Sequence, residues 1–243
     1  MQKEVKHICL WASPRNISTA IMYSFAQRKD CVVFDEPLYG FYLKNSEAKN
    51  YHPGADEIIN AMETDGQKII RDMFKNNKAE VVFYKQMTHH LLHLDLSFLS
   101  KTCNVILTRN PRNMVASFSK VIKSPDLSDL GYIEQVKLLE HLQKNNLPVL
   151  VVDSFSFIKS PEKTMRLLCE KLEISFFDSM LSWVAGAIPE DGIWAKYWYK
   201  NVHQSTGFNL PKSTPAELSA QNEFLVEKCM PLYDKLMTNS IFS

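Results

Sequence analysis

The chain has 243 residues, of which 45% are hydrophobic and 23% are charged, a composition typical of a folded globular protein. Its 28 basic and 27 acidic side chains leave a net charge of +1, which argues against a general nucleic-acid binder because such a protein needs a basic surplus. No apolar stretch suits a signal peptide or a membrane span. The five cysteines form no CxxC pair, as expected in a reducing cytosol. We therefore expect a soluble cytoplasmic protein without a nucleic-acid or membrane partner.

β-Branched apolar runs alternate with helical patterns along the chain, which predicts an α/β fold with a central parallel sheet flanked by helices. Five strands are expected, at Lys6 to Trp11, Cys31 to Phe34, Glu80 to Tyr84, Asn104 to Thr108 and Pro148 to Val152. Helices are expected at Ser18 to Arg28, Ala55 to Phe74, Asn113 to Ile122, Gly131 to Lys144, Pro161 to Leu172 and Pro215 to Met237. The chain has no repeat or low-complexity tract, so residues 1–243 are expected to form a single domain.

The first strand leads into a helix through a short segment rich in hydroxyl groups, Ser13-Pro14-Arg15-Asn16-Ile17-Ser18-Thr19. Ligands of open α/β sheets bind at the carboxyl ends of strands, and free amides at a helix start favour an anion. Arg15 supplies a permanent charge for phosphate or sulfonate oxygens, and Ser18 and Thr19 add hydroxyl donors. Asn16 can adopt the left-handed conformation that glycine often takes. Alternatively, Ser18 caps the helix and Arg15 is a surface charge.

A carboxylate pair follows the second strand. Glu36 is expected to project near the binding edge of the sheet, with Asp35 facing elsewhere. A group transfer to a hydroxyl or amine needs a general base, which typically contributes a factor of about 10²–10⁴. Glu36 is the first candidate for that base. Alternatively, the two acids and the following Pro37 form an ordinary polar turn.

The third strand is followed by Lys85, His89 and His90, and either histidine is a second candidate for the base. Lys85 can instead be a solvated charge that ends the strand. Positions 89 and 93 share a helical face and hold histidines, as in some zinc sites. No HExxH pattern or other ligand cluster accompanies them, so no metal site is expected.

The fourth strand is followed by a second segment that suits a phosphate, Arg109-Asn110-Pro111-Arg112-Asn113-Met114-Val115-Ala116-Ser117. Arg109 lies at the strand end, and Ser117 falls about two helical turns further on. These two side chains are expected to converge on one phosphate group. Alternatively, Arg109 or Arg112 pairs with acidic side chains of neighbouring loops.

An aromatic segment, residues 183–213, interrupts the alternation of strands and helices. It holds Trp183, Trp194, Tyr197, Trp198, Tyr199 and Phe208. Rings at this density favour a lid or a wall of an acceptor site for a small, partly apolar or cationic molecule. A packed C-terminal subdomain is the alternative.

The two phosphate segments resemble motifs of the sulfotransferases that use 3′-phosphoadenosine 5′-phosphosulfate (PAPS). Residues 109–117 closely match the family's motif for the 3′-phosphate, and residues 14–19 partly match its loop for the 5′-phosphosulfate. Residues 149–172 add a weaker likeness to the family's strand, loop and proline-started helix. The chain is most similar to a divergent, bacterial-like branch of small soluble members, which also carries a segment like residues 201–208.

The resemblance implies a P-loop NTPase-like three-layer sandwich with the aromatic segment as a C-terminal lid. It implies transfer of a sulfuryl group from PAPS to a small-molecule hydroxyl or amine, with adenosine 3′,5′-bisphosphate (PAP) as product and no metal. The cofactor contacts it implies are Pro14, Arg15, Asn16, Ile17, Ser18, Thr19, Arg109, Ser117, Ser205, Thr206, Gly207 and Phe208. The catalytic candidates are Arg15, Glu36, Lys85, His89 and His90.

Two residues of the first loop depart from the family pattern for binding PAPS. Ile17 stands where most members have glycine, and Asn16 replaces a serine that often donates a hydrogen bond. A nucleotide kinase or a non-catalytic nucleotide-binding protein therefore remains an alternative. A kinase, however, would carry a GxxxxGK[ST] loop, which this chain lacks.

Overall fold

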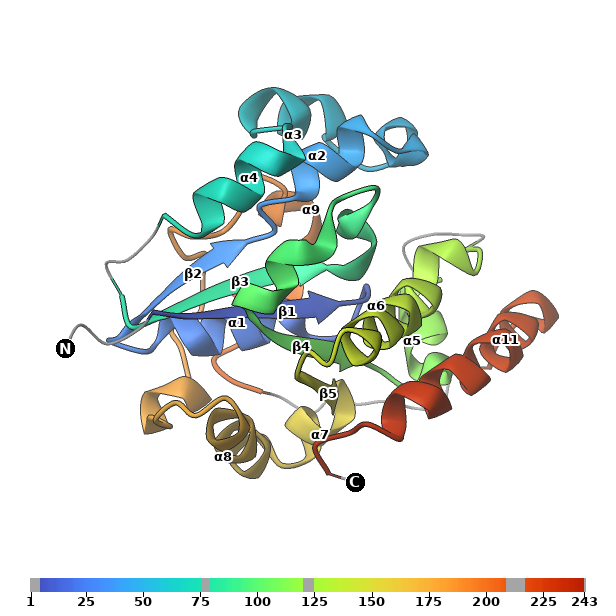
Figure 1. The fold of residues 1–243 in the computed structure, drawn as a ribbon. Coiled ribbons are helices and arrows are strands. Elements are labelled where there is room, and N and C mark those ends of the chain that lie inside the picture. Colours follow the sequence, from blue (N-terminus) through green and yellow to red (C-terminus); the bar gives the residue numbers. More distant parts are fainter. Residues whose placement is uncertain (1–4, 76–78, 120–124, 209–216, 243) are drawn as a thin grey trace.

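The computed structural model describes residues 5–75, 79–119, 125–208 and 217–242. A parallel sheet forms the centre of the molecule, with the strand order β2-β3-β1-β4-β5 (Figure 1). Its strands are β1 (Lys6–Ala12), β2 (Cys31–Asp35), β3 (Val81–Met87), β4 (Cys103–Thr108) and β5 (Val149–Asp153). The five predicted strands are confirmed, with small shifts at their ends that are largest where β3 runs on to Met87.

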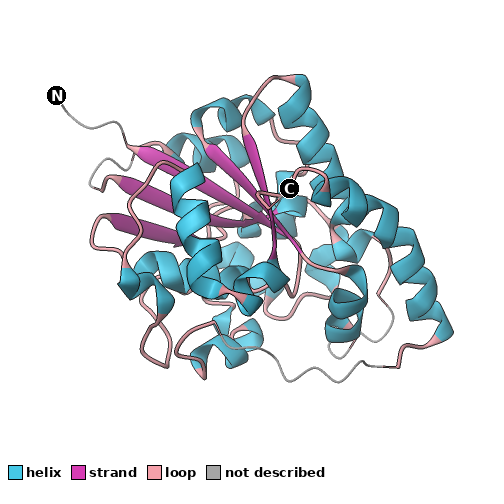
Figure 2. Ribbon diagram, turned by 90° about the horizontal axis from the view of Figure 1, so that it is seen from below, coloured by secondary structure: helices cyan, strands magenta, loops and turns pink. Residues whose placement is uncertain are grey.

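Successive residues of the strands alternate between two buried faces, as the pleat of a sheet requires. On β1, Ile8 and Leu10 belong to one apolar cluster, whereas Cys9 and Trp11 belong to the other. Figure 2 shows helices on both sides of the strands. The predicted three-layer sandwich is therefore confirmed.

Each face of the sheet has its own set of helices. The Ile8 face is covered by α1 (Ser18–Ala26), α7 (Ser154–Lys159) and α8 (Pro161–Lys171). The Trp11 face is covered by α4 (Gly66–Met73), α5 (Pro111–Phe118), α6 (Tyr132–Lys144) and α11 (Ala220–Met237). The 3₁₀ turns between these elements are η1 (Glu47–Asn50), η2 (Thr88–Leu91), η3 (Leu96–Lys101), η4 (Ser128–Leu130) and η5 (Asp178–Leu181).

A third, smaller cluster packs together helices from the two halves of the chain. It joins α2 (Tyr39–Lys44) and α3 (Ala55–Ala61) to α9 (Ala195–Trp198), and α10 (Lys200–His203) follows directly. Trp194 and Tyr199 are buried in this cluster, so the aromatic segment is packed against the body of the protein.

Two predicted helices differ from the structure. The helix expected from Ala55 to Phe74 is two helices, because the backbone of Met62 is extended and Asp65 starts α4 by accepting a hydrogen bond from the Lys68 amide. Aspartate and threonine favour caps over helix interiors, which explains the break. The last helix, expected from Pro215, begins at Ala220, and residues 215–216 lie outside the described residues. Residues 120–122, the end of the helix expected from Asn113 to Ile122, lie outside them as well. The short α2 and α7 were not predicted.

This arrangement brings the segments that follow β1, β2, β3 and β4 to one edge of the sheet. β1 lies between β3 and β4, so the loop after β1 faces the ends of both neighbours. Among the described residues, no helix is long and apolar enough to cross a membrane.

We predict that Leu139→Ala lowers the free energy of unfolding by about 2–5 kcal/mol, because it leaves a cavity in the Trp11 face of the core. Urea denaturation measures the change. Val184→Ala is the control, since Val184 is 86% exposed and its removal should cost less than about 0.5 kcal/mol. Equal effects of the two substitutions would contradict the packing described here.

Candidate active site

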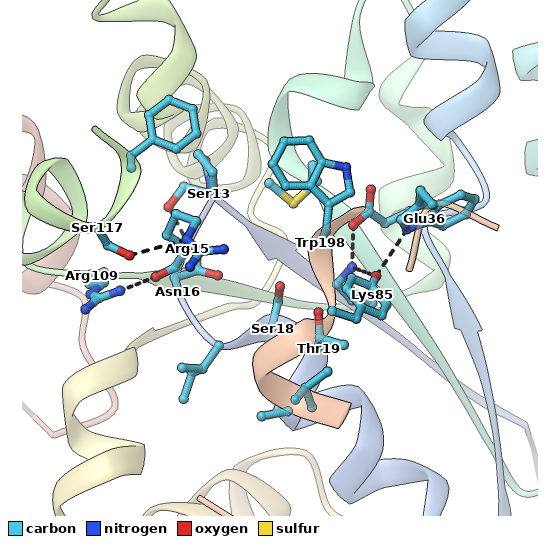
Figure 3. A pocket seen from close by; sticks show the side chains of 18 of the residues that line it. Ser13, Arg15, Asn16, Ser18, Thr19, Glu36, Lys85, Arg109, Ser117 and Trp198 are labelled. Carbon is cyan, nitrogen blue, oxygen red and sulfur yellow. Dashed lines mark hydrogen bonds and ion pairs between the residues drawn. The ribbon is translucent and has the colours of Figure 1, made fainter. Parts of the chain in front are cut away.

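A cavity of about 770 Å³ opens at the carboxyl edge of the sheet. It is lined by nearly all of the residues that the sequence singled out: Pro14, Arg15, Asn16, Ile17, Ser18, Thr19, Glu36, Lys85, His89, His90, Arg109, Ser117, Ser205, Gly207 and Phe208. In Figure 3, Arg15, Arg109 and Ser117 lie on one side of this pocket, and Glu36 and Lys85 lie on the other. Ser18 and Thr19 at the start of α1 and Trp198 lie between the two groups.

The loop between β1 and α1 takes the left-handed conformation at two residues that are not glycine. Arg15 has φ 59° and Ile17 has φ 65°, whereas Asn16 has no positive φ, so the left-handed conformation considered for Asn16 is not the one it adopts. Asn16 is instead buried, and its side-chain amide donates to the Leu107 carbonyl at 2.6 Å and to Ser13 Oγ at 3.2 Å. These bonds tie the loop to β4 and stabilise a backbone that costs an isoleucine about 1–3 kcal/mol.

Ile17 is also the N-cap of α1, and its side chain accepts no hydrogen bond from the helix amides. Ser18 lies inside the first turn, so the alternative that Ser18 caps the helix is wrong. No capping side chain therefore satisfies the first amides of α1, and the helix dipole favours negative charge at this end of the helix.

Two guanidinium groups lie beside this loop. Arg15 Nε donates to Ser117 Oγ at 3.3 Å, and the Arg109 guanidinium donates to the Arg15 carbonyl. Among the described residues, neither has a carboxylate partner within ion-pair distance. Arg112, by contrast, pairs with Glu223 on the surface at 2.5 Å. The alternative that an arginine of this segment pairs with an acidic side chain therefore holds for Arg112 but, among the described residues, not for Arg109.

Burial lowers the pKa of Arg15. Burial also lowers the pKa of Arg109, and the nearby positive charge of Arg15 lowers it further. Arginine remains protonated despite such shifts. The protein thus holds two like charges at one wall of the cavity, an arrangement that a multiply charged anion would stabilise.

The opposite wall holds a buried charge cluster. The Lys85 ammonium donates to Asp35 Oδ1 at 2.9 Å, to Tyr199 Oη at 2.6 Å and to the Glu36 carboxylate. Asp35 also accepts from the Gly192 amide at 3.0 Å and from Tyr199 at 2.7 Å. The expectation that Asp35 faces elsewhere is therefore wrong, because both carboxylates face Lys85.

The protonation of this cluster follows from its burial. Burial alone lowers the pKa of Lys85, but the carboxylates of Asp35 and Glu36 outweigh it and hold that pKa well above its ordinary range. Burial raises the pKa of Glu36, although Lys85 opposes the shift. Burial and Asp35 together raise the pKa of Tyr199. Lys85 is therefore charged, and Glu36 takes up a proton more readily than an exposed glutamate does, as suits a base.

His90 and His89 complete the same wall. His90 Nε2 lies 3.9 Å from Glu36 Oε2, and the ring of His90 stacks on Tyr39. Burial lowers the pKa of His89 to about 3 and holds the pKa of His90 well below its ordinary value, so both rings are neutral. Within the part of the chain that the structure describes, no three His, Cys, Asp or Glu side chains form a metal-binding group.

The aromatic segment contributes to the cavity through Trp194, Trp198 and Tyr199. Trp183 lies in the core and stacks edge-on against Phe208. Thr206 does not line the cavity; its carbonyl accepts a hydrogen bond from the Trp183 amide. Residues 209–213 of the predicted lid lie outside the described residues.

The sequence analysis missed several residues of the site. Asp35 and Tyr199 bind Lys85, and the further lining residues include Tyr39, Tyr42, Tyr51, His52, Asp129 and Glu134. Asp35 stands next to Glu36 in the sequence and was a visible candidate. Tyr199 was expected only as one ring of the aromatic segment, and its bond to Asp35 carried no sequence signal because the two residues are 164 positions apart.

Comparison with known proteins gives the family. A family model described as "Sulfotransferase domain" matches residues 6–240. The chain belongs to the sulfotransferase domain family. Solved sulfotransferases share the fold. The enzyme from Alicyclobacillus acidocaldarius has a TM-score of 0.57 at 12% identity and covers 97% of this chain and 95% of its own. The sulfotransferase domain from the curacin biosynthetic pathway has a TM-score of 0.53 at 14% identity, covering 93% of this chain and 98% of its own.

Two Arabidopsis thaliana proteins are more similar in sequence. Branched-chain-amino-acid aminotransferase-like protein 2 is 41% identical over 228 residues, which make up 93% of this chain and 40% of that protein. Branched-chain-amino-acid aminotransferase-like protein 1 is 40% identical over 233 residues, covering 94% of this chain and 41% of that protein. The sulfotransferase domain described here thus spans about two fifths of these curated relatives.

We predict that Lys85→Met lowers the free energy of unfolding at pH 7.5 by about 3–5 kcal/mol, because it leaves two buried carboxylates without a counter-ion. Burial raises the pKa of Glu36, so its ionised form costs most in the folded state once the ammonium is gone. The loss should therefore shrink as pH falls through the raised pKa toward about 4.

Urea unfolding at pH 7.5 and 5.5 measures this effect. Lys196→Met is the control, because the Lys196 pair with Glu57 is exposed to water and should add little to stability. A Lys85→Met deficit that is the same at both pH values, or larger at pH 5.5, would refute the proposed charge balance.

Proposed function

We propose that this domain transfers a sulfuryl group from PAPS to a hydroxyl or amine of a small-molecule acceptor, with PAP as the product. One observation carries the proposal: Arg15 and Arg109, without carboxylate partners among the described residues, lie in a large cavity beside the start of α1, which has no capping side chain. Family membership supports sulfotransferase chemistry. PAPS suits the site because it carries a phosphate on each side of its ribose and can share its charge between two segments.

In the proposed complex, residues 14–19 bind the 5′-phosphosulfate, and Arg109 with Ser117 binds the 3′-phosphate. The hydroxyls of Ser18 and Thr19 lie at the start of α1, between the two walls of the pocket. Ser205, Gly207 and Phe208 of the aromatic segment line the same cavity and are proposed as further cofactor contacts. Thr206 does not line the cavity and is therefore not part of the proposed contacts.

Sulfuryl transfer, like phosphoryl transfer, should pass through a loose, in-line transition state, so catalysis depends on position and on charge neutralisation. Arg15 and the α1 amides would stabilise the charge that builds on the leaving phosphate. Glu36 would accept the proton of the acceptor hydroxyl or amine. His89 and His90 remain second candidates for this base, and Lys85 would hold the Glu36 carboxylate in position.

That residues 1–243 act as a single domain with residues 183–213 as its lid remains a prediction, as does the cytoplasmic location. The proposal requires no metal, because the two guanidinium groups supply the positive charge that a divalent ion supplies in kinases.

We predict that PAP binds without Mg²⁺ and that Arg109→Ala weakens it about 10- to 100-fold, through loss of a charge-assisted contact. Isothermal titration calorimetry with and without Mg²⁺ measures the affinity. Arg112→Ala is the matched control, because Arg112 belongs to the same segment but pairs with Glu223 outside the cavity. Binding that requires Mg²⁺ would favour a nucleotide phosphotransferase, and no binding would refute the proposal.

With an acceptor that the wild type turns over, Glu36→Gln should lower kcat about 10²- to 10⁴-fold through loss of the base. Its Kd for PAP should stay within about twofold, since Glu36 lies across the cavity from the two guanidinium groups. Transfer of labelled sulfate from PAPS and calorimetry with PAP provide the two measurements. An unchanged kcat would assign the base to another residue.

A further inference from the structure

The first turn of α6 lies behind the two segments that are proposed to bind PAPS. Tyr132 and Gln135 of this turn are fully buried, and neither of them lines the cavity. Each donates a side-chain hydrogen bond to the backbone at or just after the end of β4. Any effect of these two side chains on a bound nucleotide therefore passes through the backbone that they hold.

Tyr132 holds the residue that carries the second guanidinium group. Its hydroxyl donates to the Arg109 carbonyl at 2.5 Å. Because a peptide group is planar, this bond restrains the plane that follows Arg109 and the direction in which the Arg109 side chain leaves the backbone. The guanidinium itself donates to the Arg15 carbonyl, so its place beside the first loop depends on that direction (Figure 3).

Gln135 holds the other segment through a shared carbonyl. Its side-chain amide donates to the Leu107 carbonyl at 2.8 Å, and the Asn16 amide donates to the same oxygen at 2.6 Å. A carbonyl oxygen has two lone pairs, one for each of these amides. Asn16 anchors the left-handed loop, so Gln135 is linked to that loop by two hydrogen bonds in series.

The residue that precedes α6 packs directly against the first loop. Gly131 has φ 73°, and a Cβ at this position would lie 3.3 Å from Ser13 Cβ and 3.8 Å from Pro14 Cδ. The start of α6 therefore contacts the loop after β1 as well as the backbone of Leu107 and Arg109. One helix turn thus holds the two phosphate segments at a fixed spacing.

The amide oxygen of Gln135 indicates that packing alone does not explain this residue. Its Oε1 is buried and has no hydrogen-bond partner in the part of the chain that the structure describes. A buried acceptor without a donor lowers stability, and a leucine of similar volume would avoid that cost. What a leucine would lack is the hydrogen bond to Leu107, which is the bond that reaches the loop.

We propose that Tyr132 and Gln135 are positioning residues for the sulfuryl donor. Tyr132 acts through Arg109 on the 3′-phosphate, and Gln135 acts through Leu107 and Asn16 on the loop for the 5′-phosphosulfate. This inference rests on the proposed function and adds to it two residues outside the cavity. PAP has to meet both segments at once, so a shift of either segment weakens its binding.

Isothermal titration calorimetry with PAP, together with urea unfolding, tests the proposal on three single variants. Tyr132→Phe and Gln135→Leu should each weaken PAP binding about 3- to 10-fold, the value of one hydrogen bond. Tyr84→Phe is the matched control, because the Tyr84 hydroxyl also donates to a backbone carbonyl, that of Met73, and Tyr84 lies in the same buried cluster outside the cavity. Its Kd for PAP should stay within about twofold of the wild-type value although its stability falls.

Two further readouts separate positioning from packing. The urea midpoint of Gln135→Leu should not fall, because this variant removes a buried acceptor that has no donor among the described residues. In the Arg109→Ala background, Tyr132→Phe should change the Kd of PAP by less than about twofold, since its effect passes through the missing guanidinium. Gln135→Leu should still weaken binding in that background, because it acts on the other segment.

Failure of the wild-type protein to bind PAP refutes the proposed function itself. With normal PAP binding, any of four results overturns the positioning roles alone. Tyr84→Phe weakens PAP binding as much as the other variants do, or Tyr132→Phe keeps its full effect in the Arg109→Ala background. Gln135→Leu loses stability along with affinity, or either of the two variants in α6 binds PAP as the wild type does.

Discussion

The charge of Lys85 is the constraint on which the site depends. A buried ammonium is tolerated only when its hydrogens meet acceptors, and here two carboxylates and a tyrosine hydroxyl provide them. The carboxylates come from the end of β2, the ammonium from β3 and the hydroxyl of Tyr199 from the aromatic segment. One interaction therefore fixes the end of the sheet, the orientation of Glu36 and the wall of the cavity.

The opposite wall follows a different principle. Here the protein leaves two guanidinium groups and a helix start without counter-charges among the described residues, and it places them on a loop that holds left-handed residues at Arg15 and Ile17. The hydrogen bonds of the buried Asn16 side chain to Ser13 and Leu107 offset the cost of this backbone. The cavity therefore has two walls of different charge: one holds the unpaired guanidinium groups of Arg15 and Arg109, and the other holds the balanced charges around Lys85.

The sequence was sufficient for the five strands, for a parallel sheet flanked by helices and for the residues that gather at the carboxyl edge, because each depends on local pattern and on the geometry of parallel sheets. The three-layer sandwich was implied by the resemblance to the sulfotransferases. It misjudged Asn16, since a polar residue that suits a left-handed turn is equally able to anchor one through its side chain. It separated Asp35 from Glu36 because strand alternation predicts opposite faces, whereas Glu36 lies past the strand with φ 43°. It placed Tyr199 in the aromatic segment but did not reveal its bonds to Lys85 and Asp35, which depend on packing between distant segments.

The bonds of Asp35 to Gly192 and Tyr199 also bear on how the chain folds. They join residues 157 and 164 positions apart, so the partners of Lys85 are complete only after a large loop has closed. Closing such loops is entropically costly and slows folding. Until the aromatic segment docks, the ammonium and its carboxylates stay open to water on that side. The wall around Lys85 is therefore expected to be among the last parts of the molecule to become ordered, and it couples completion of the candidate site to completion of the fold.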